Sequence, residues 1–148
     1  MKPVWGLFIA LVAVVAVSLL TKALRPHDII PWRYNYMAAL EEAHVADRRA
    51  FLYFSATWCG PCEDMKHTTW ADTKVEAALR DYVPVKIDLD GRQDLALLYG
   101  VEGVPAYVVL DPSGNPLARW DGSMPSDVFL QTLERVPTTR PATSLLAP

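Results

Sequence analysis

The chain has 148 residues, of which 51% are hydrophobic and 21% charged, so one ordinary domain with short appendages is possible and disorder throughout is excluded. The formal net charge is −3 and no basic cluster stands out, so we expect no nucleic-acid partner. Two cysteines cannot form the multi-bridge framework of a small secreted scaffold.

The first predicted element is an apolar helix at the N-terminus. Residues 4–20 carry no charge, and as a helix they would be ~25 Å long at ~1.5 Å per residue, slightly shorter than a ~30 Å hydrocarbon layer. Residues 21–23 can extend this helix toward the membrane surface by snorkelling. The sequences around Ser18 and Ala23 are poor cleavage sites, which favours an uncleaved membrane anchor over residues 1–24. A cleaved signal peptide stays the alternative.

The charges that flank the apolar stretch give opposing indications of its orientation. Lys22, Arg25 and Arg33 outnumber Lys2 with the terminal amine, which favours a cytoplasmic C-terminal side. A short cationic start followed by an apolar stretch is instead typical of an export signal, so we expect the remainder on the extracytoplasmic side, anchored or as an exported soluble form. Residues 25–31 follow as a polar, proline-punctuated linker.

Beyond the linker, helical patterns alternate with short apolar strands. In chain order we expect a helix over 32–48, a strand over 50–55, helices over 61–67 and 72–81, a strand over 83–89, a helix over 93–99, strands over 106–110 and 117–120, and a helix over 125–135. This order predicts an α/β domain over residues 32–136, with a mixed sheet flanked by helices. The composition of residues 137–148 is typical of a disordered tail.

The two cysteines lie in the sequence Trp58-Cys59-Gly60-Pro61-Cys62, between a predicted strand and a predicted helix. A pair at this spacing can close and open a disulfide and so transfer two electrons per cycle. At a helix N-terminus, unpaired N–H groups and the helix dipole lower the pKa of the first thiol. Half of a structural zinc site is the alternative, but the chain has no second cysteine pair to complete one. We therefore expect a redox pair that needs no metal and no cofactor.

These residues resemble the active site of the thioredoxin family, whose signature is WCGPC. Residues 99–106, YGVEGVPA, resemble the second signature of that family, in which a strand begins at a cis-proline, here Pro105. Residues 68–75 are more similar to a subgroup that includes the periplasmic C-terminal domain of the membrane disulfide reductase and small exported thioredoxin-like proteins. The resemblance covers about residues 32–136 and implies a thioredoxin fold.

The sulfur chemistry and the resemblance together imply a thiol-disulfide oxidoreductase. Cys59, expected to be the exposed sulfur, attacks a substrate disulfide, and Cys62 then resolves the mixed disulfide. The residues expected to bind the substrate are Trp58, Gly60, Pro61, Val104 and Pro105, with the Val104 backbone presented to an extended strand. The Gly-Pro dipeptide resembles reducing members of the family more than oxidants.

Expected partners are protein disulfides or dithiols, a membrane electron donor, and the membrane itself through residues 4–20. Two alternatives stay open. One is a binding module of thioredoxin fold, and the other is an acceptor dedicated to one partner, such as a membrane electron transporter or apocytochrome c.

The chain also departs from the family pattern near the cysteines. Tyr53 stands where the family has a buried aspartate that assists proton transfer with the second cysteine, and a tyrosine, with a reference pKa of ~10, cannot act as a carboxylate base. His67 replaces a helix-kinking proline. Glu63 replaces a lysine, and its carboxylate is expected to disfavour a thiolate. Lys86 and Asp90 match a charged pair of the family. These departures argue against fast, general reductase activity.

Overall fold

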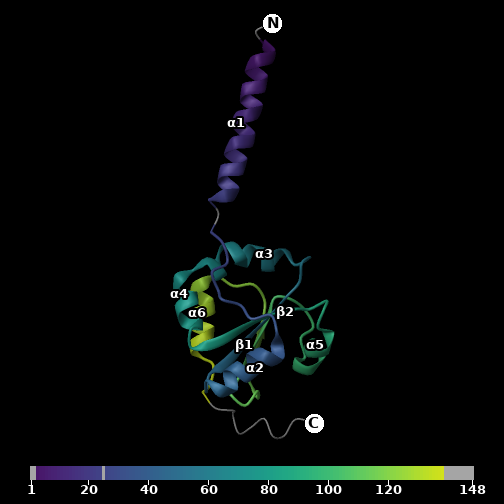
Figure 1. Cartoon of the computed structure of the whole chain (residues 1–148), viewed down its shortest axis with the longest axis vertical. Helices are drawn as coiled ribbons and strands as arrows, with labels where there is room; N and C mark the ends of the chain where they lie inside the picture. The colour runs from purple at the N-terminus through teal and green to yellow at the C-terminus, as the bar shows by residue number, and fades with distance from the viewer. Residues whose placement is uncertain (1–2, 25, 139–148) are drawn as a thin grey trace.

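The structure is a computed structural model that describes residues 3–24 and 26–138 (Figure 1). Its elements in chain order are α1 (Pro3–Ala23), α2 (Tyr36–Val45), β1 (Arg49–Ser55), α3 (Gly60–His67), the 3₁₀ helix η1 (Thr69–Ala71), α4 (Thr73–Leu79), β2 (Tyr82–Asp88), α5 (Gln93–Tyr99), β3 (Ala106–Leu110), β4 (Pro116–Asp121) and α6 (Ser126–Glu134). Helix α1 extends away from the other elements, which form a sheet covered by helices.

The sheet has four strands in the order β2-β1-β3-β4. β1 runs parallel to β2 and antiparallel to β3, and β3 runs antiparallel to β4, so the predicted mixed sheet is confirmed. β1 lies in the middle because six of its seven residues are buried and only its first residue is charged. Tyr53 on β1 pairs with Lys86 on β2 and with Tyr107 on β3.

Alternate side chains of β1 point to opposite faces of the sheet, and the two faces have different compositions. We call one the aromatic face; its core contains Phe51, Tyr53, Trp70, Tyr107 and Phe129 together with both cysteines, and Trp32 and Trp120 pack against it. We call the other the aliphatic face; its core contains Ala39, Ala43, Ala50, Leu52, Val83, Val85, Leu95 and Val108, with Tyr36 and Phe54 as its only buried aromatic rings among the described residues.

Helix α2 begins later than the sequence pattern predicted. The expectation was a helix from residue 32, but residues 32–35 are not helical. The backbone of Arg33 is instead used beside β2, where its N–H donates to the Pro84 oxygen and its oxygen accepts from the Lys86 N–H, both at 2.8 Å. The Asn35 side chain then caps α2 by accepting the Ala38 N–H at 3.1 Å.

Helix α4 is shorter than the helix predicted over residues 72–81. The Asp72 side chain caps its start, and the helix ends at Leu79. The preceding turn, η1, was not expected and places Trp70 fully in the aromatic core. The remaining predicted helices and strands agree with the structure to within one or two residues at each end.

Helix α1 has 21 residues and is therefore about 32 Å long at ~1.5 Å per residue. This helix includes residues 21–23, as expected, and is therefore longer than the ~25 Å of residues 4–20 alone. The segment Trp5–Ala23 has a mean hydropathy of 2.3 and none of it is buried, so its length and composition suffice to cross a membrane. Residues 139–148 of the predicted tail lie outside the described residues.

Candidate active site

The two cysteines lie where the chain leaves β1 and enters α3. Cys59 is the N-cap of α3, with extended backbone angles, and Pro61 occupies the first turn, where its missing N–H removes no helical hydrogen bond. Cys62 lies within that first turn. The two sulfurs form a disulfide across a Cα–Cα distance of 5.3 Å. The predicted redox pair is therefore formed by the local geometry of one helix start.

The hydrogen bonding of the two sulfurs differs. The backbone N–H of Cys62 donates to the Cys59 sulfur at 3.2 Å, so this sulfur occupies the position of an N-capping acceptor. No bond of this kind reaches the Cys62 sulfur within the described residues. Both the N–H group and the helix dipole stabilise negative charge at Cys59 once the disulfide is reduced.

Exposure does not distinguish the two cysteines. Cys59 is 4% exposed and Cys62 is 3% exposed, and both belong to the core of the aromatic face. The expectation of an exposed Cys59 is therefore wrong for the disulfide form, in which the bond holds its sulfur toward Cys62. The difference between the two sulfurs in this form lies in hydrogen bonding.

Trp58 projects beside the pair and is 64% exposed. Its indole N–H donates to the Asp90 carboxylate at 2.9 Å, which fixes the ring at the surface, and Gly60 and Pro61 next to it are exposed. Asp90 therefore bonds to the tryptophan, whereas within the described part of the chain Lys86 makes no ion pair. Sequence reasoning missed the Trp58–Asp90 contact, since the two residues are 32 positions apart and no periodicity connects them.

The predicted cis-proline is confirmed, because the Val104–Pro105 peptide bond is cis. Val104 is partly buried and packs against the cluster that contains both cysteines, while Pro105 is buried and its carbonyl accepts the Gly122 N–H at 2.8 Å. In the described chain the backbone N–H and C=O of Val104 make no hydrogen bond. They are thus free to pair with an extended peptide beside the disulfide.

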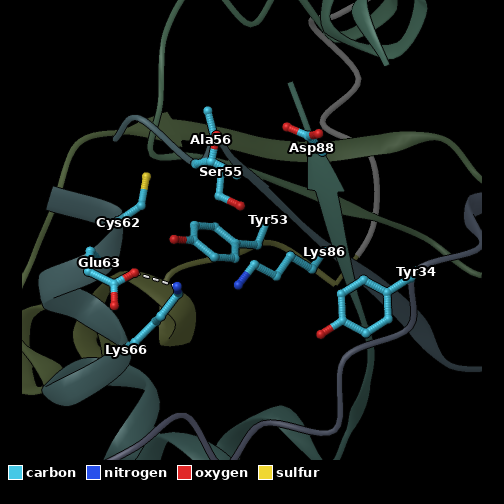
Figure 2. Close-up of a pocket in the computed structure, with 10 residues that line it drawn as sticks. Tyr34, Tyr53, Ser55, Ala56, Cys62, Glu63, Lys66, Lys86 and Asp88 are labelled. Atoms are coloured by element: carbon cyan, nitrogen blue, oxygen red, sulfur yellow. Dashed lines mark hydrogen bonds and ion pairs between the residues drawn. The ribbon is translucent and has the colours of Figure 1, made fainter. Parts of the chain in front are cut away.

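A cavity of about 220 Å³ lies on the inner side of Cys62 (Figure 2). Tyr53 and Lys86 line it from neighbouring strands, and Glu63 and Lys66 line it from α3. Burial lowers the pKa of Lys86, whose Nζ atom is 5.6 Å from the centre of the Tyr53 ring. Polar groups from three elements therefore meet beside the inner cysteine.

Tyr53 is fully buried, and its hydroxyl points in Figure 2 toward the side of the cavity where Cys62 and Glu63 lie. That hydroxyl has no hydrogen-bond partner among the described residues. Burial raises the pKa of Tyr53 to about 12, although the indole N–H of Trp70 lies near enough to oppose this rise without reaching hydrogen-bond geometry. Tyr53 therefore stays protonated at neutral pH and cannot accept a proton from Cys62.

The carboxylate of Glu63 is paired within α3. It forms an ion pair with Lys66 and lies 3.6 Å from the Nε2 atom of His67, and the hydrogen bond from Lys66 holds the pKa of Glu63 below its usual range. Glu63 is therefore ionised at neutral pH, but the ammonium group of Lys66 partly compensates its charge. The Glu63 carboxylate therefore destabilises a nearby cysteine thiolate less than an unpaired carboxylate would.

Comparison with known proteins gives matches over this region. A family model described as a thioredoxin-like domain matches residues 36–137. The thiol:disulfide interchange protein DsbD of Ralstonia nicotianae is 36% identical over 102 residues, which are 66% of this chain and 17% of DsbD. The thiol:disulfide interchange protein TxlA of Synechococcus elongatus is 31% identical over 101 residues, 68% of this chain and 53% of TxlA. The chain thus spans less than a fifth of DsbD and about half of TxlA.

Two solved structures have the same arrangement of helices and strands. A thioredoxin from Thermus thermophilus superposes with a TM-score of 0.65 and 31% identity, covering 72% of this chain and 86% of the thioredoxin. The reduced C-terminal domain of DsbD from Neisseria meningitidis superposes with a TM-score of 0.61 and 26% identity, covering 68% of this chain and 93% of that domain.

Proposed function

This chain belongs to the thioredoxin-like family, and we propose that it uses Cys59 and Cys62 to reduce protein disulfides on the extracytoplasmic side of a membrane. The predicted thioredoxin fold is confirmed, and the matches to thiol:disulfide interchange proteins and thioredoxins support a thiol-disulfide exchange activity. The direction of the reaction, its substrates and its location belong to the proposal.

The observation that carries the proposal is the position of Cys59 at the N-cap of α3, with the Cys62 N–H bonded to its sulfur. In the reduced protein this position favours the thiolate, which is the attacking form in disulfide exchange. The exposed Trp58 and the unbonded backbone of Val104 flank the pair and offer a peptide one apolar ring and one strand edge. A protein segment that carries a disulfide fits this arrangement.

The reaction proceeds through two exchanges. The Cys59 thiolate attacks one sulfur of the substrate disulfide, so a mixed disulfide forms and the other substrate sulfur leaves as a thiolate. The Cys62 thiolate then attacks the Cys59 sulfur, the Cys59–Cys62 disulfide forms, and the second substrate thiolate leaves. Two electrons pass to the substrate, and its two thiolates take up protons that the two cysteines have lost.

Deprotonation of Cys62 needs a base other than residue 53. Because Tyr53 stays protonated, the route we propose for this proton is the polar cavity beside Cys62, which Lys86, Glu63 and Lys66 line. Resolution of the mixed disulfide is therefore slower than with a buried carboxylate at this position.

Two features favour reduction over oxidation. The Gly60-Pro61 dipeptide resembles reducing members of the family. The carboxylate of Glu63, one residue after Cys62, limits how far the thiolate is stabilised, and strong thiolate stabilisation is what makes an oxidant of this class. The Lys66 cation beside Glu63 weakens this second effect without removing it.

The location is inferred from α1, whose length and composition suit a membrane span, and from the cationic start that precedes it. In an oxidising compartment, the pair then depends on a membrane protein that delivers electrons across the bilayer.

Reduction of insulin disulfides by the dithiothreitol-reduced chain tests the reaction, and labelling of intact cells with a membrane-impermeant maleimide tests the location. We expect insulin reduction and labelling of Cys59 before lysis. Labelling only after lysis would place the domain in the cytoplasm. Failure to reduce insulin, with a mixed disulfide formed to one membrane protein, would favour the dedicated acceptor instead.

A further inference from the structure

Residues 26–32, which follow α1, are docked onto the folded domain; we call them the strap. The Nδ1 atom of His67, at the end of α3, lies 2.6 Å from the Pro26 carbonyl oxygen, to which it must donate a proton. Three residues further on, the N–H of Ile29 donates to the Trp70 oxygen at 2.9 Å. The strap is therefore bonded to the active-site helix and to the turn that follows it.

The interior of the strap is fixed as well. The Asp28 carboxylate accepts the Ile30 N–H at 3.0 Å and the indole N–H of Trp32 at 2.8 Å. Ile30 is only 6% exposed, and the Trp32 ring lies 5.3 Å from both the Tyr53 and the Trp70 rings. Such burial makes the strap part of the aromatic core, so it cannot act as a flexible linker.

Docking of the strap shortens the connection between α1 and the domain. Only residues 24 and 25 stand between the end of α1 and the first docked residue, Pro26. An extended chain spans at most ~3.5 Å per residue, so this connection can reach about 10 Å. A free linker over residues 25–31 could reach about 25 Å. If α1 crosses a membrane, the face of the domain at His67 cannot move far from the bilayer.

The active-site helix lies on that same face. In Figure 1, α3 runs along the side of the domain from which α1 leaves. Cys59 is eight residues from His67, which is about 12 Å along a helix. Along this helix the charged side chains of Glu63 and Asp64 are exposed and those of Lys66 and His67 are partly exposed, which suits a surface close to lipid headgroups.

We propose that the docked strap confines the Cys59–Cys62 pair of the anchored protein to disulfides near the membrane surface, so that it favours membrane-bound proteins whose disulfides lie within roughly 22 Å of the bilayer, the combined length of the ~10 Å connection and the ~12 Å from His67 to Cys59. This inference rests on the proposed function, since it needs both the reductase activity and the membrane anchor. The strap adds a limit on the distance from the membrane at which the cysteine pair can react, and the reductase activity alone would impose no such limit.

Reach is measured with the full chain, reduced by dithiothreitol, freed of reductant and incorporated into vesicles of phosphatidylcholine and phosphatidylglycerol at about three to one. The probe is a synthetic transmembrane peptide that carries a fluorophore through a disulfide. Its spacer is either two residues or twenty prolines, which extend about 60 Å at ~3.1 Å per residue. Each exchange oxidises one Cys59–Cys62 dithiol and releases one fluorophore thiol, so a single turnover suffices.

The near probe is expected to release its fluorophore at least about tenfold faster than the far probe, because tethering raises the effective concentration only within reach. A 20-residue Gly-Ser insert between residues 24 and 25 should reduce this ratio below about threefold. The matched control carries the same insert after Ser113, in the turn between β3 and β4, and should keep the ratio of the unmodified chain.

The outcomes separate the two proposals. Equal rates on both probes with the unmodified chain, or a ratio that the insert after residue 24 leaves unchanged, would overturn the limit on reach while leaving the reductase activity intact. Loss of reduction of both probes and of soluble insulin would overturn the proposed function itself. A chain that does not sediment with the vesicles would refute the anchor and the reach limit together.

Discussion

The two faces of the sheet both bury an apolar core but differ in chemistry. The aliphatic face is closed by α2 and α5 with small and branched side chains. The aromatic face holds the disulfide among large rings, and it also holds all three buried polar atoms that lack a hydrogen-bond partner among the described residues: Tyr53 Oη, Trp70 Nε1 and Trp120 Nε1.

The unpaired polar atoms make the aromatic face the less stable of the two faces in its hydrogen bonding. Leaving a buried donor or acceptor without a partner costs about 1–3 kcal/mol, so natural proteins keep such groups few. In this protein they occur on the face that contains the redox pair, next to a polar cavity. Departures from local packing rules are expected at functional sites, and their position on the aromatic face agrees with the proposed role of the cysteine pair.

The largest effect is expected from exchanging one atom on the aromatic face. Cys59→Ser should lower the rate of insulin reduction by about 1000-fold or more, because the attacking thiolate is removed. On the aliphatic face, the matched change Leu52→Ala should lower the free energy of unfolding by about 2–5 kcal/mol and leave the rate per folded molecule unchanged. Rates near wild type in the Cys59→Ser variant would locate the chemistry elsewhere.

Introducing a base beneath Cys62 is the next strongest change. Tyr53→Asp should speed insulin reduction severalfold, since the carboxylate can accept the Cys62 proton, and should cost about 3 kcal/mol of stability or more from the buried charge. Burial raises the pKa of the introduced Asp side chain above its reference value of ~3.9. The loss of folding stability therefore develops as the pH rises above ~3.9.

Tyr53→Asn is the control for this experiment, because it removes the ring without adding a charge. It should destabilise the fold to an extent that does not vary with pH and should leave the rate unchanged. An equal rate for wild type and the Tyr53→Asp variant, with the fold preserved, would show that proton transfer from Cys62 does not limit turnover.

A smaller difference is expected between two stacked tyrosines of the aromatic face. Tyr53 and Tyr107 are fully buried neighbours with ring centres 5.7 Å apart, but only the Tyr107 hydroxyl is bonded, to the Gly122 oxygen at 3.2 Å and to the Met65 sulfur at 3.1 Å. Tyr107→Phe should cost about 1 kcal/mol in urea unfolding, whereas Tyr53→Phe should be neutral or stabilise by up to about 1 kcal/mol. Equal losses for the two variants would mean that the Tyr53 hydroxyl has a partner.

The smallest effect lies outside the redox face. Arg33 makes two hydrogen bonds to the Glu42 carboxylate, and this hydrogen bonding holds the pKa of Glu42 below its usual range. The carboxyl pKa is lower in the folded state, so the pair stabilises the fold above the unfolded pKa of ~4.3, and this contribution is lost as the pH falls through the folded value.

Glu42→Gln should therefore lower stability by at most about 1 kcal/mol at pH 7 and by nothing near pH 2, with no change in insulin reduction. Thermal unfolding of the variant and the wild type across this pH range measures the difference. A difference that persists at pH 2 would assign the effect to packing of the side chain instead of its charge.

Much of the fold could be predicted because local patterns and tertiary structure agree. The apolar run of β1 and the Gly-Val-Pro sequence before Pro105 correctly indicated a central strand and a cis-proline. The start of α2 was predicted wrongly, because the helical spacing of residues 32–35 was overridden by the pairing of Arg33 with β2. Asn35, a common N-cap residue, was the available signal for the true start.

The cysteine pair of the candidate site was predictable from the sequence, but its contacts were less so. The cysteine motif identified the sulfurs, yet their equal burial depends on packing that no periodicity encodes. The bond from Trp58 to Asp90 joins distant positions, and the ion pair of Glu63 with Lys66 and its contact with His67 depend on side-chain conformation. Helical spacing of three and four residues was the signal that could have revealed the Glu63 pairs.

The central claim is that Cys59 attacks and Cys62 resolves, although both sulfurs are equally buried in the disulfide form. The most direct measurement is a trap with a disulfide-containing protein such as insulin, followed by non-reducing gels and mass spectrometry. Cys62→Ser should accumulate a one-to-one mixed disulfide through Cys59 that dithiothreitol releases, and Cys59→Ser should accumulate none. A stable mixed disulfide through Cys62 in the Cys59→Ser variant, formed as fast as with Cys62→Ser, would contradict the assignment.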